Sequence, residues 1–400
     1  MSKGLLPVHS VSVKVPSSQG LMMAATLDLP DTDPIAYAMF AHCFTGSRFT
    51  PAAARVSKTL AESGVACLRF DFPGLSQSEG DFSKTTFNSN VDDIVAASQW
   101  LTEHYSAPQL LIGHSLGGAA SLKAATKISC LKAVATIGAP FDPAHAVLHF
   151  ADRICDVDDQ GAVTLQLGGR DVTISREFLE DLAEVNPEDH LRRLRKPLLL
   201  LHSPTDQTVG VDNAQLIFRV TRYPKSLMTL DKADHLLTKD GTAQRAARII
   251  ANWVEPYLVP ENVCEDLPEF VAEASTIKAS KYGAAIRTGG HNFITDRDKS
   301  QGGKNLGFTP TSLLVSALAA ANSQTIKQAA IDNRIKGLDD VKVTISQEQS
   351  ADHGQIKLRR KISLIGNLSD ADSASLRAAS NSCSITQLLA QGIVIDDEVN

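Results

Sequence analysis

Short apolar runs alternate with stretches in which apolar residues recur every three or four positions, up to about residue 258. The short runs predict strands at residues 10–15, 21–29, 35–41, 65–70, 109–112, 133–137, 197–202 and 226–230. The helical spacing predicts helices at residues 51–63, 89–104, 117–128, 212–220 and 242–254. This alternation is typical of βαβ units, so we expect an α/β fold whose sheet is mostly parallel and has helices on both faces. The first two strands leave no room for a crossover helix, so we expect them to pair antiparallel.

Residues 141–194 interrupt this alternation. Two β-type segments at residues 162–167 and 171–174 are joined around Gly168 and Gly169, which predicts a hairpin. Helical pieces flank the hairpin. We therefore interpret residues 141–194, approximately, as a cap inserted between two strands of a first domain that spans residues 1–258.

A second domain is expected after a linker. Residues 259–268 carry two prolines and three acidic residues with little periodicity, as a linker does. Residues 269–400 then predict strands at 271–280, 284–293, 341–347, 355–364 and 393–395, with helices that begin at Pro310, at Asp370 and near Cys383. Strands with segregated helices indicate a smaller α+β domain. A length of 400 residues also favours two domains over one core.

Charge and cysteine content narrow the classes of function. The formal net charge is −6 and no basic stripe is present, so we expect no nucleic-acid partner. No apolar run approaches the length of a membrane span, and the N-terminus lacks the apolar core of a signal peptide. The six cysteines are scattered without metal-binding spacing, as reduced thiols are. We therefore expect a cytoplasmic protein with no membrane partner and no metal.

A candidate nucleophile stands in the pentapeptide from Gly113 to Gly117, which reads G-H-S-L-G. An apolar strand precedes it and a helix of small residues follows it, which is the setting of a nucleophile elbow. Only glycine fits on either side of the serine in so tight a turn. The sequence therefore predicts that the Ser115 hydroxyl stands clear of the sheet, at the positive end of a helix dipole.

A serine nucleophile needs a base and an acid that orients the base. In this kind of fold both follow the serine in the order acid, then histidine. Asp206 and His235 fit this order, and each lies in a loop just after a predicted strand. Asp142, which also follows a strand, is an alternative acid; we favour Asp206. For the two N–H donors of an oxyanion hole, we expect Leu116 and, from the loop after residues 35–41, Phe44.

The N-terminal part resembles the α/β-hydrolases of the esterase and dienelactone-hydrolase-like branch. The elbow carries this resemblance, together with the segment from Arg69 to Gly80, which is similar to the R-x-D-x-P-G-x-G-x-S-x-G turn of these enzymes. The resemblance implies that Ser115 is the nucleophile, His235 the base and Asp206 the orienting acid. It also implies a serine hydrolase that cleaves a small-molecule carboxylic ester or thioester through an acyl-enzyme, without a cofactor.

The C-terminal part resembles the OsmC/Ohr family of thiol-dependent hydroperoxide reductases. The similarity covers Phe308-Thr309-Pro310 after a glycine-rich loop, the helix from Leu313 to Ala320, and the segment from Asn381 to Ile385. This chemistry requires two cysteines, one to attack the peroxide and one to resolve the sulfenate. Ala321 stands where the attacking cysteine belongs, whereas Cys383 matches the resolving one.

We expect from this difference that the second domain lacks the peroxidase chemistry of its family. The resemblance implies a homodimer built through the OsmC-like domain, which then serves mainly in dimerisation. The alternative function is an organic hydroperoxide reductase with an accessory hydrolase domain. A non-catalytic scaffold is a third hypothesis, against which the intact serine, aspartate and histidine argue.

Overall fold

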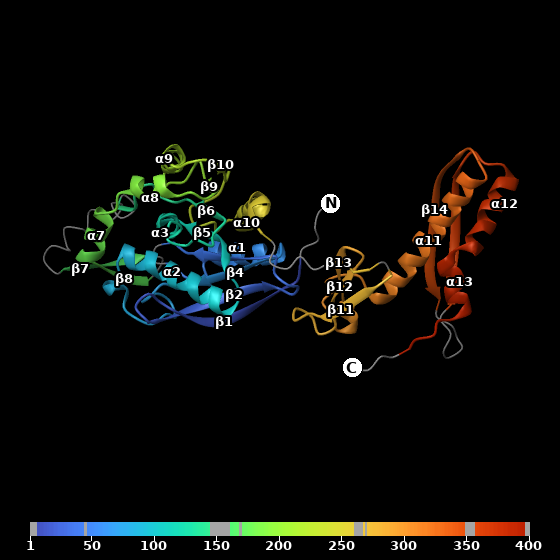
Figure 1. The fold of residues 1–400 in the computed structure, drawn as a ribbon, viewed down its shortest axis with the longest axis horizontal. Helices are drawn as coiled ribbons and strands as arrows, with labels where there is room; N and C mark the ends of the chain where they lie inside the picture. Colours follow the sequence, from blue (N-terminus) through green and yellow to red (C-terminus); the bar gives the residue numbers. More distant parts are fainter. Residues whose placement is uncertain are drawn as a thin grey trace. The chain divides into compact units, whose positions relative to one another are not determined.

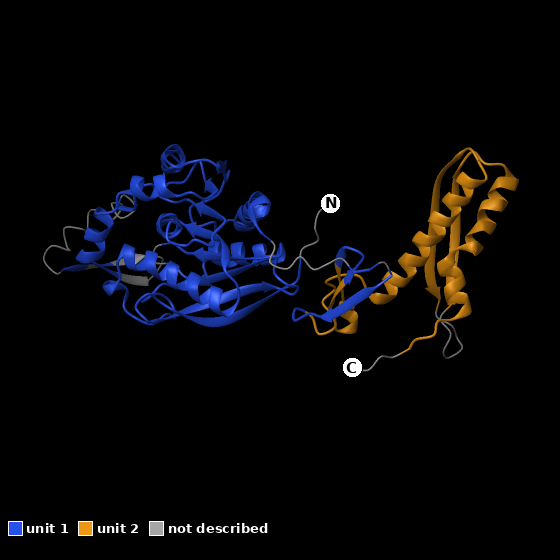
Figure 2. Cartoon of the chain, in the orientation of Figure 1, with its two compact units in different colours: residues 1–279, 287–292 blue, residues 280–286, 293–400 orange. Residues whose placement is uncertain are grey.

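The computed structural model describes residues 6–43, 46–144, 161–167, 170–259, 267–268, 270–348 and 357–396. The chain divides into two compact units (Figure 2). The first comprises residues 1–279 with 287–292, and the second comprises residues 280–286 with 293–400. The limits at residues 258 and 269 that the sequence suggests for the two domains stay a prediction.

An eight-stranded sheet forms the centre of the first unit (Figure 1). In spatial order its strands are β1 (Val8–Pro16), β2 (Met22–Pro30), β4 (Val65–Phe70), β3 (Ala36–Ala41), β5 (Pro108–His114), β6 (Ala133–Ile137), β9 (Leu198–His202) and β10 (Lys225–Thr229). The pairs β1–β2 and β2–β4 are antiparallel, and the other pairs are parallel. The predicted antiparallel start of the sheet is confirmed.

Helices cover both faces of this sheet because its strands alternate apolar side chains between two cores. On one face, α1 (Pro51–Glu62) and α10 (Thr242–Val254) pack with Cys67 of β4 and Ile112 of β5. On the other face, α2 (Phe87–His104), α3 (Leu116–Ala124) and α9 (Asp212–Val220) pack with Leu68 of β4 and Leu111 of β5. The predicted α/β fold is confirmed.

The segment between β6 and β9 departs from the βα alternation, as the sequence suggests. Its described part holds the hairpin β7 (Ala162–Leu167) and β8 (Arg170–Ser175), followed by α7 (Arg176–Ala183) and α8 (Pro187–Arg193). Phe178 and Leu182 of α7 are buried in the core that also holds Phe82 of the loop after β4. The hairpin thus lies in an insertion packed onto the α2 side of the sheet.

After residue 270, the described residues form a three-stranded and a two-stranded sheet. The first contains β11 (Ala272–Thr276), β12 (Ala284–Thr288) and β13 (His291–Thr295). The second pairs β14 (Leu338–Glu348) with β15 (Lys357–Gly366), next to the helices α11 (Pro310–Asp332), α12 (Asp370–Ala379) and α13 (Ser384–Gln391).

Two predicted strands in this region are wrong. Residues 284–293 form two strands instead of one, because Gly289 and Gly290 adopt positive φ values of 46° and 72° and turn the chain back. Residues 393–395 form no strand. Their apolar side chains are exposed, and their backbone pairs with no neighbouring strand among the described residues. None of the described helices has the length and apolarity needed to cross a bilayer.

Candidate active site

Ser115 occupies a sharp turn between β5 and α3. Its φ and ψ are 55° and −127°, a conformation that residues with a side chain rarely adopt. A Cβ atom on Gly113 would lie 2.5 Å from the carbonyl oxygen of Gly117, and one on Gly117 would lie 2.1 Å from that of His42. Both glycines are therefore required for the close approach of strand, turn and helix.

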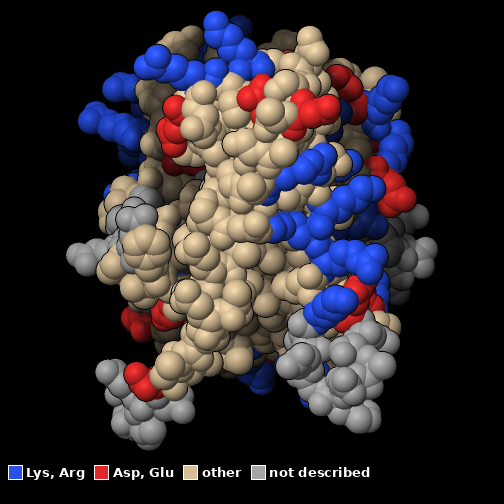
Figure 3. All heavy atoms as spheres, turned by 90° about the vertical axis from the view of Figure 1, so that its right-hand side faces the viewer, with Lys and Arg blue, Asp and Glu red and all other residues tan. Residues whose placement is uncertain are grey.

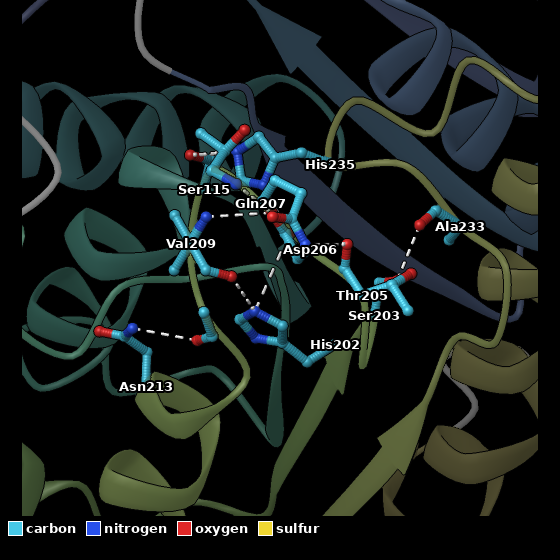
Figure 4. Close-up of polar contacts among 12 residues, drawn as sticks. Ser115, His202, Ser203, Thr205, Asp206, Gln207, Val209, Asn213, Ala233 and His235 are labelled. Carbon is cyan, nitrogen blue, oxygen red and sulfur yellow. Dashed lines mark hydrogen bonds and ion pairs between the residues drawn. The ribbon is translucent and has the colours of Figure 1, made fainter. Parts of the chain in front are cut away.

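Three side chains from distant parts of the sequence meet at this turn (Figure 4). His235 Nε2 lies 2.9 Å from Ser115 Oγ, and His235 Nδ1 lies 2.7 Å from Asp206 Oδ2. Ser115 follows β5, Asp206 follows β9 and His235 follows β10. Because these strands are parallel, their carboxyl ends lie at one edge of the sheet and bring the three groups together.

The Asp206 carboxylate is oriented by its own loop. Its Oδ1 accepts hydrogen bonds from the N–H groups of Thr208 (2.9 Å) and Val209 (3.0 Å), which leaves Oδ2 to His235. Burial by itself would raise the pKa of Asp206, but these hydrogen bonds and that from His235 hold the pKa below its ordinary value. An ionised Asp206 favours the tautomer in which His235 Nδ1 carries the proton and Nε2 can accept one from Ser115. The alternative acid, Asp142, accepts a hydrogen bond from the Ala144 N–H group.

Further contacts fix the loop that carries His235. The backbone oxygen of His235 lies 2.8 Å from Nε2 of His114, the residue before the candidate nucleophile. Burial first, and then the nearby His235, lower the pKa of His114 to about 4, so it is neutral at pH 7 and donates through Nε2. The hydroxyl of Ser203 donates to the Ala233 carbonyl at 2.7 Å and ties the two loops together (Figure 4). The motif alone gave no signal for these contacts, since the residue before the serine is variable in G-x-S-x-G.

Two N–H donors for an oxyanion were predicted, at Leu116 and Phe44. Leu116 is the first residue of α3, where N–H groups have no acceptor within the helix. Phe44 lies outside the described residues. The ends of its loop are anchored by hydrogen bonds from the Gly46 N–H group to the Cys43 carbonyl (2.9 Å) and between His42 Nδ1 and the same oxygen (2.8 Å). Burial raises the pKa of the Cys43 thiol to about 11, which makes it a packed thiol and not a nucleophile.

A buried ion pair, which the sequence did not reveal, holds the far end of this loop. The guanidinium of Arg48 pairs with the carboxylate of Asp71 in the turn after β4, and the Arg48 N–H group donates to Asp71 at 2.6 Å. The neighbouring Arg69 pairs with Asp28 at 2.8 Å and also donates to the Arg48 carbonyl. The position of Arg48 is the one signal for this pair. Arg48 follows a buried strand and its loop, where a charged side chain needs a partner.

In the second unit, Ala321 lies on α11 and Cys383 at the start of α13. Ala321 is half-buried and its carbonyl accepts a hydrogen bond from Thr325 (2.8 Å). Cys383 is 1% exposed. Burial would raise the pKa of its thiol, but hydrogen bonds from the Thr386 N–H and hydroxyl groups and from Thr325 lower it. Within the described ranges, no three His, Cys, Asp or Glu side chains gather as metal ligands would.

Comparison with known sequences and structures finds a matching family for each of the two parts of the chain. The sequence model of the alpha/beta hydrolase family matches residues 38–262, and that of OsmC-like proteins matches residues 302–397. A search of curated proteins finds no match. The esterase domain of a Rhodothermus marinus protein is 42% identical, with a TM-score of 0.52, over 63% of this chain and 100% of that domain. Est1E from Butyrivibrio proteoclasticus, solved with ferulic acid, is 20% identical with a TM-score of 0.52, over 61% of this chain and 98% of that one, which is a likeness of fold alone.

The two matches agree with the architecture. The hydrolase match covers more than half of the chain and includes the elbow, the loops of Asp206 and His235, and the parallel strands β5, β9 and β10 that precede these residues. The Rhodothermus marinus esterase domain supports a hydrolase activity. The chain belongs to the alpha/beta hydrolase family and carries an OsmC-like domain in its C-terminal part.

Proposed function

We propose that the protein is a serine hydrolase that cleaves carboxylic esters or thioesters of small molecules through an acyl-enzyme. The single observation that carries this proposal is the hydrogen-bonded series Ser115, His235 and Asp206, at 2.9 Å and 2.7 Å. Similarity to the Rhodothermus marinus esterase domain, at 42% identity, supports the same class of reaction.

The arrangement suits a two-step reaction. Ser115 Oγ attacks the acyl carbon while His235 Nε2 takes the hydroxyl proton, and the N–H group of Leu116, with that of Phe44, stabilises the oxyanion. The C–O or C–S bond then breaks and His235 returns the proton to the leaving alkoxide or thiolate. Water attacks the acyl-enzyme with His235 as base, which releases the carboxylic acid and restores Ser115. Asp206 stabilises the imidazolium in both steps.

Replacement of the nucleophile tests this function. Ser115→Ala should lower kcat for short p-nitrophenyl esters by roughly 10⁴-fold or more, because the hydroxyl that forms the acyl-enzyme is absent. A fluorophosphonate probe should label the wild-type protein at Ser115 and leave the variant unlabelled. Ester turnover at the wild-type rate in a folded Ser115→Ala protein would refute the assignment.

For the OsmC-like part we propose a role mainly in dimerisation. Two observations support it: Ala321 offers no thiol to attack a peroxide, and much of the apolar surface of α11 is exposed in the single chain. Leu314 of this helix is 47% exposed, and Ala317 and Ala320 are exposed too. The stretch of α11 from Leu313 to Ala321 is apolar on nearly all sides, and such a helix is expected to be buried. Its exposed surface therefore favours association with a second copy of the chain. Consumption of an organic hydroperoxide that depends on Cys383 would contradict the proposed loss of peroxidase chemistry.

A further inference from the structure

His202, the last residue of β9, is a buried histidine that takes no part in the proposed reaction. Its side chain is 1% exposed and lies among the polar groups of the candidate site (Figure 4). The sheet holds its backbone, because the Leu230 N–H group donates to the His202 carbonyl oxygen at 2.8 Å. A side chain on so fixed a backbone can hold a neighbouring loop in place.

The ring of His202 reaches Val209, near the end of the loop that carries Asp206 (Figure 4). His202 Nε2 lies 2.8 Å from the Val209 carbonyl oxygen, which can only accept, so Nε2 carries the proton and donates it. Val209 is 5% exposed, so donor and acceptor are both shielded from water. The hydrogen bond therefore joins the end of the strand to the far part of the loop.

Val209 passes this restraint on to the carboxylate. Its carbonyl oxygen accepts from His202, and its N–H group donates to Asp206 Oδ1 at 3.0 Å. Asp206 Oδ2 is then directed to His235 Nδ1, at 2.7 Å. His202 Nε2 lies 3.8 Å from the same Oδ2, which is too long for a hydrogen bond. His202 therefore acts on the carboxylate through Val209.

Other hydrogen bonds of this loop restrain its two ends. Ser203 ties the start of the loop to the Ala233 carbonyl, and Asn213 donates to the Gly210 carbonyl at 3.0 Å. Neither of these two bonds includes Asp206 or Val209. The part of the loop that orients the carboxylate thus relies on His202.

Resting on the proposed function, we propose that His202 is a positioning residue for the orienting acid. Its Nε2–H group fixes the Val209 peptide and, through it, the Asp206 carboxylate, which in turn keeps the His235 ring oriented to accept the proton of Ser115. A misplacement of about 1 Å in such a set can lower the rate by about 100-fold. Removal of this hydrogen bond should therefore slow the chemical steps more than it weakens substrate binding.

Two substitutions at this position separate the donor from the bulk of the ring. His202→Phe keeps a ring without the N–H group, and should lower kcat for p-nitrophenyl esters by about 10-fold or more while KM stays within about threefold. His202→Gln places an amide N–H group close to the position of Nε2 and should restore most of the lost kcat. Wild-type kcat in His202→Phe, or an equal loss in both variants, would overturn the proposal.

Thr221→Val is the matched control for lost stability. Thr221 is 4% exposed and its hydroxyl donates to the Ile217 carbonyl at 2.8 Å, so this variant also loses a buried hydrogen bond to a carbonyl. Urea unfolding should show a loss in both variants, whereas kcat should fall in His202→Phe alone. An equal fall of kcat in the control would mean that His202 acts through stability only. Should His202→Phe not fold, His202→Asn, whose amide is too short to reach Val209, takes its place.

Crystal structures of the variants add a readout that does not depend on turnover. In His202→Phe or His202→Asn, Asp206 Oδ2 should leave hydrogen-bond distance of His235 Nδ1, and in His202→Gln the contact should be intact. If no ester is hydrolysed but this difference is present, the serine hydrolase assignment fails and the positioning by His202 holds. If Ser115→Ala is inactive but His202→Phe matches the wild type in kcat and in this contact, the assignment of His202 alone fails.

Discussion

The sharp turn at Ser115 depends on the absence of a side chain at Gly113 and Gly117, two positions before and after it. Ser115 has a φ of 55°, which costs about 1–3 kcal/mol for a residue with a Cβ atom and persists only when the surroundings impose it. The surroundings here are tight. Gly117 lies against the backbone oxygens of Ala41 and His42, at the end of β3, so the elbow and the loop of the proposed oxyanion hole are in direct contact.

Gly117→Ala should therefore damage both stability and activity. The new Cβ would meet the His42 oxygen at 2.1 Å, and backbone atoms must shift to relieve this contact. We expect a loss of about 1–3 kcal/mol in the free energy of unfolding, measured with urea, and a lower kcat for p-nitrophenyl esters. Gly20→Ala is the control: Gly20 has a φ of 82° but nothing within 4 Å of a Cβ, so it should cost stability without lowering kcat. Wild-type values for Gly117→Ala would argue against the tight elbow.

At the scale of elements, the candidate site is held by loops that are fastened to one another and to the strands. The loop after β3 is anchored by the buried Arg48–Asp71 ion pair, whose side chains are 6% and 0% exposed. The loop after β10 is held by Asp234, whose carboxylate accepts hydrogen bonds from the Thr238 N–H (3.0 Å) and hydroxyl (2.8 Å) groups and from the Lys239 N–H group (3.1 Å). The positions of the candidate catalytic residues therefore depend on charged side chains outside the set of Ser115, His235 and Asp206.

Arg48→Met should leave the Asp71 carboxylate buried without its cation. Breaking a buried pair in this way costs about 3–5 kcal/mol, so urea unfolding should reveal a large loss of stability. The control is Arg192→Met, which breaks the exposed pair with Glu188 on α8, where the side chains are 66% and 46% exposed. An exposed pair contributes about 0–1 kcal/mol, and the control should unfold almost as the wild type does. Equal effects of the two substitutions would contradict the burial of the Arg48 pair.

Asp234 predicts a pH dependence of stability. Burial would raise its pKa, but hydrogen bonds from Thr238 and Lys239 lower it to about 2, below the ordinary 3.8. A lowered pKa in the folded state stabilises the protein above pH 4 or so, and this contribution is lost as the pH falls toward 2. Asp234→Asn should thus be less stable than the wild type at pH 7, and the difference should shrink between about pH 4 and pH 2. Thermal unfolding measures both; Asp231→Asn, at an exposed position of the same loop, should give no such difference.

At the scale of the whole molecule, the two units differ in how much apolar surface they bury. The hydrolase sheet has a large core on each face, whereas the fully buried core between α11, α12, β14 and β15 consists of Ile326, Ala330 and Leu376. Figure 3 shows a band of uncharged residues on the face turned to the viewer, with Lys and Arg to its right and also at its upper left. The weak core and the exposed apolar helix favour association between copies of the chain.

The full chain should therefore be a dimer by light scattering at micromolar concentration. Leu314→Glu, which places a charge on the exposed apolar side of α11, should lower the measured mass toward that of the 42.8 kDa monomer. Lys327→Glu, on the same helix outside its apolar stretch, serves as a charge control and should stay dimeric. A monomeric wild-type protein would rule out the proposed dimerisation.

Local patterns along the chain predicted most of the elements and the order of the candidate catalytic residues. Strand–turn–helix around Ser115, and the position of Asp206 and His235 just after predicted strands, follow from local periodicity and motif. Every main strand of the hydrolase sheet lies within a few residues of its predicted limits, because alternating burial leaves a clear pattern in the residues. The antiparallel pairing of β1 and β2 at the edge of the sheet was indicated only by the short connection between them. The pattern failed at Gly289 and Gly290, where a turn divides residues 284–293 between two strands.

Which of these side chains meet depends on how distant elements pack, and the folded structure was needed to show it. Asp206 and Asp142 were both open as partners of His235, and the hydrogen bond at 2.7 Å goes to Asp206. The Arg48–Asp71 pair joins residues from different elements, and no spacing along the chain encodes such a contact. Local structure depends on neighbours within a few positions, whereas a site depends on packing between elements that are far apart in sequence.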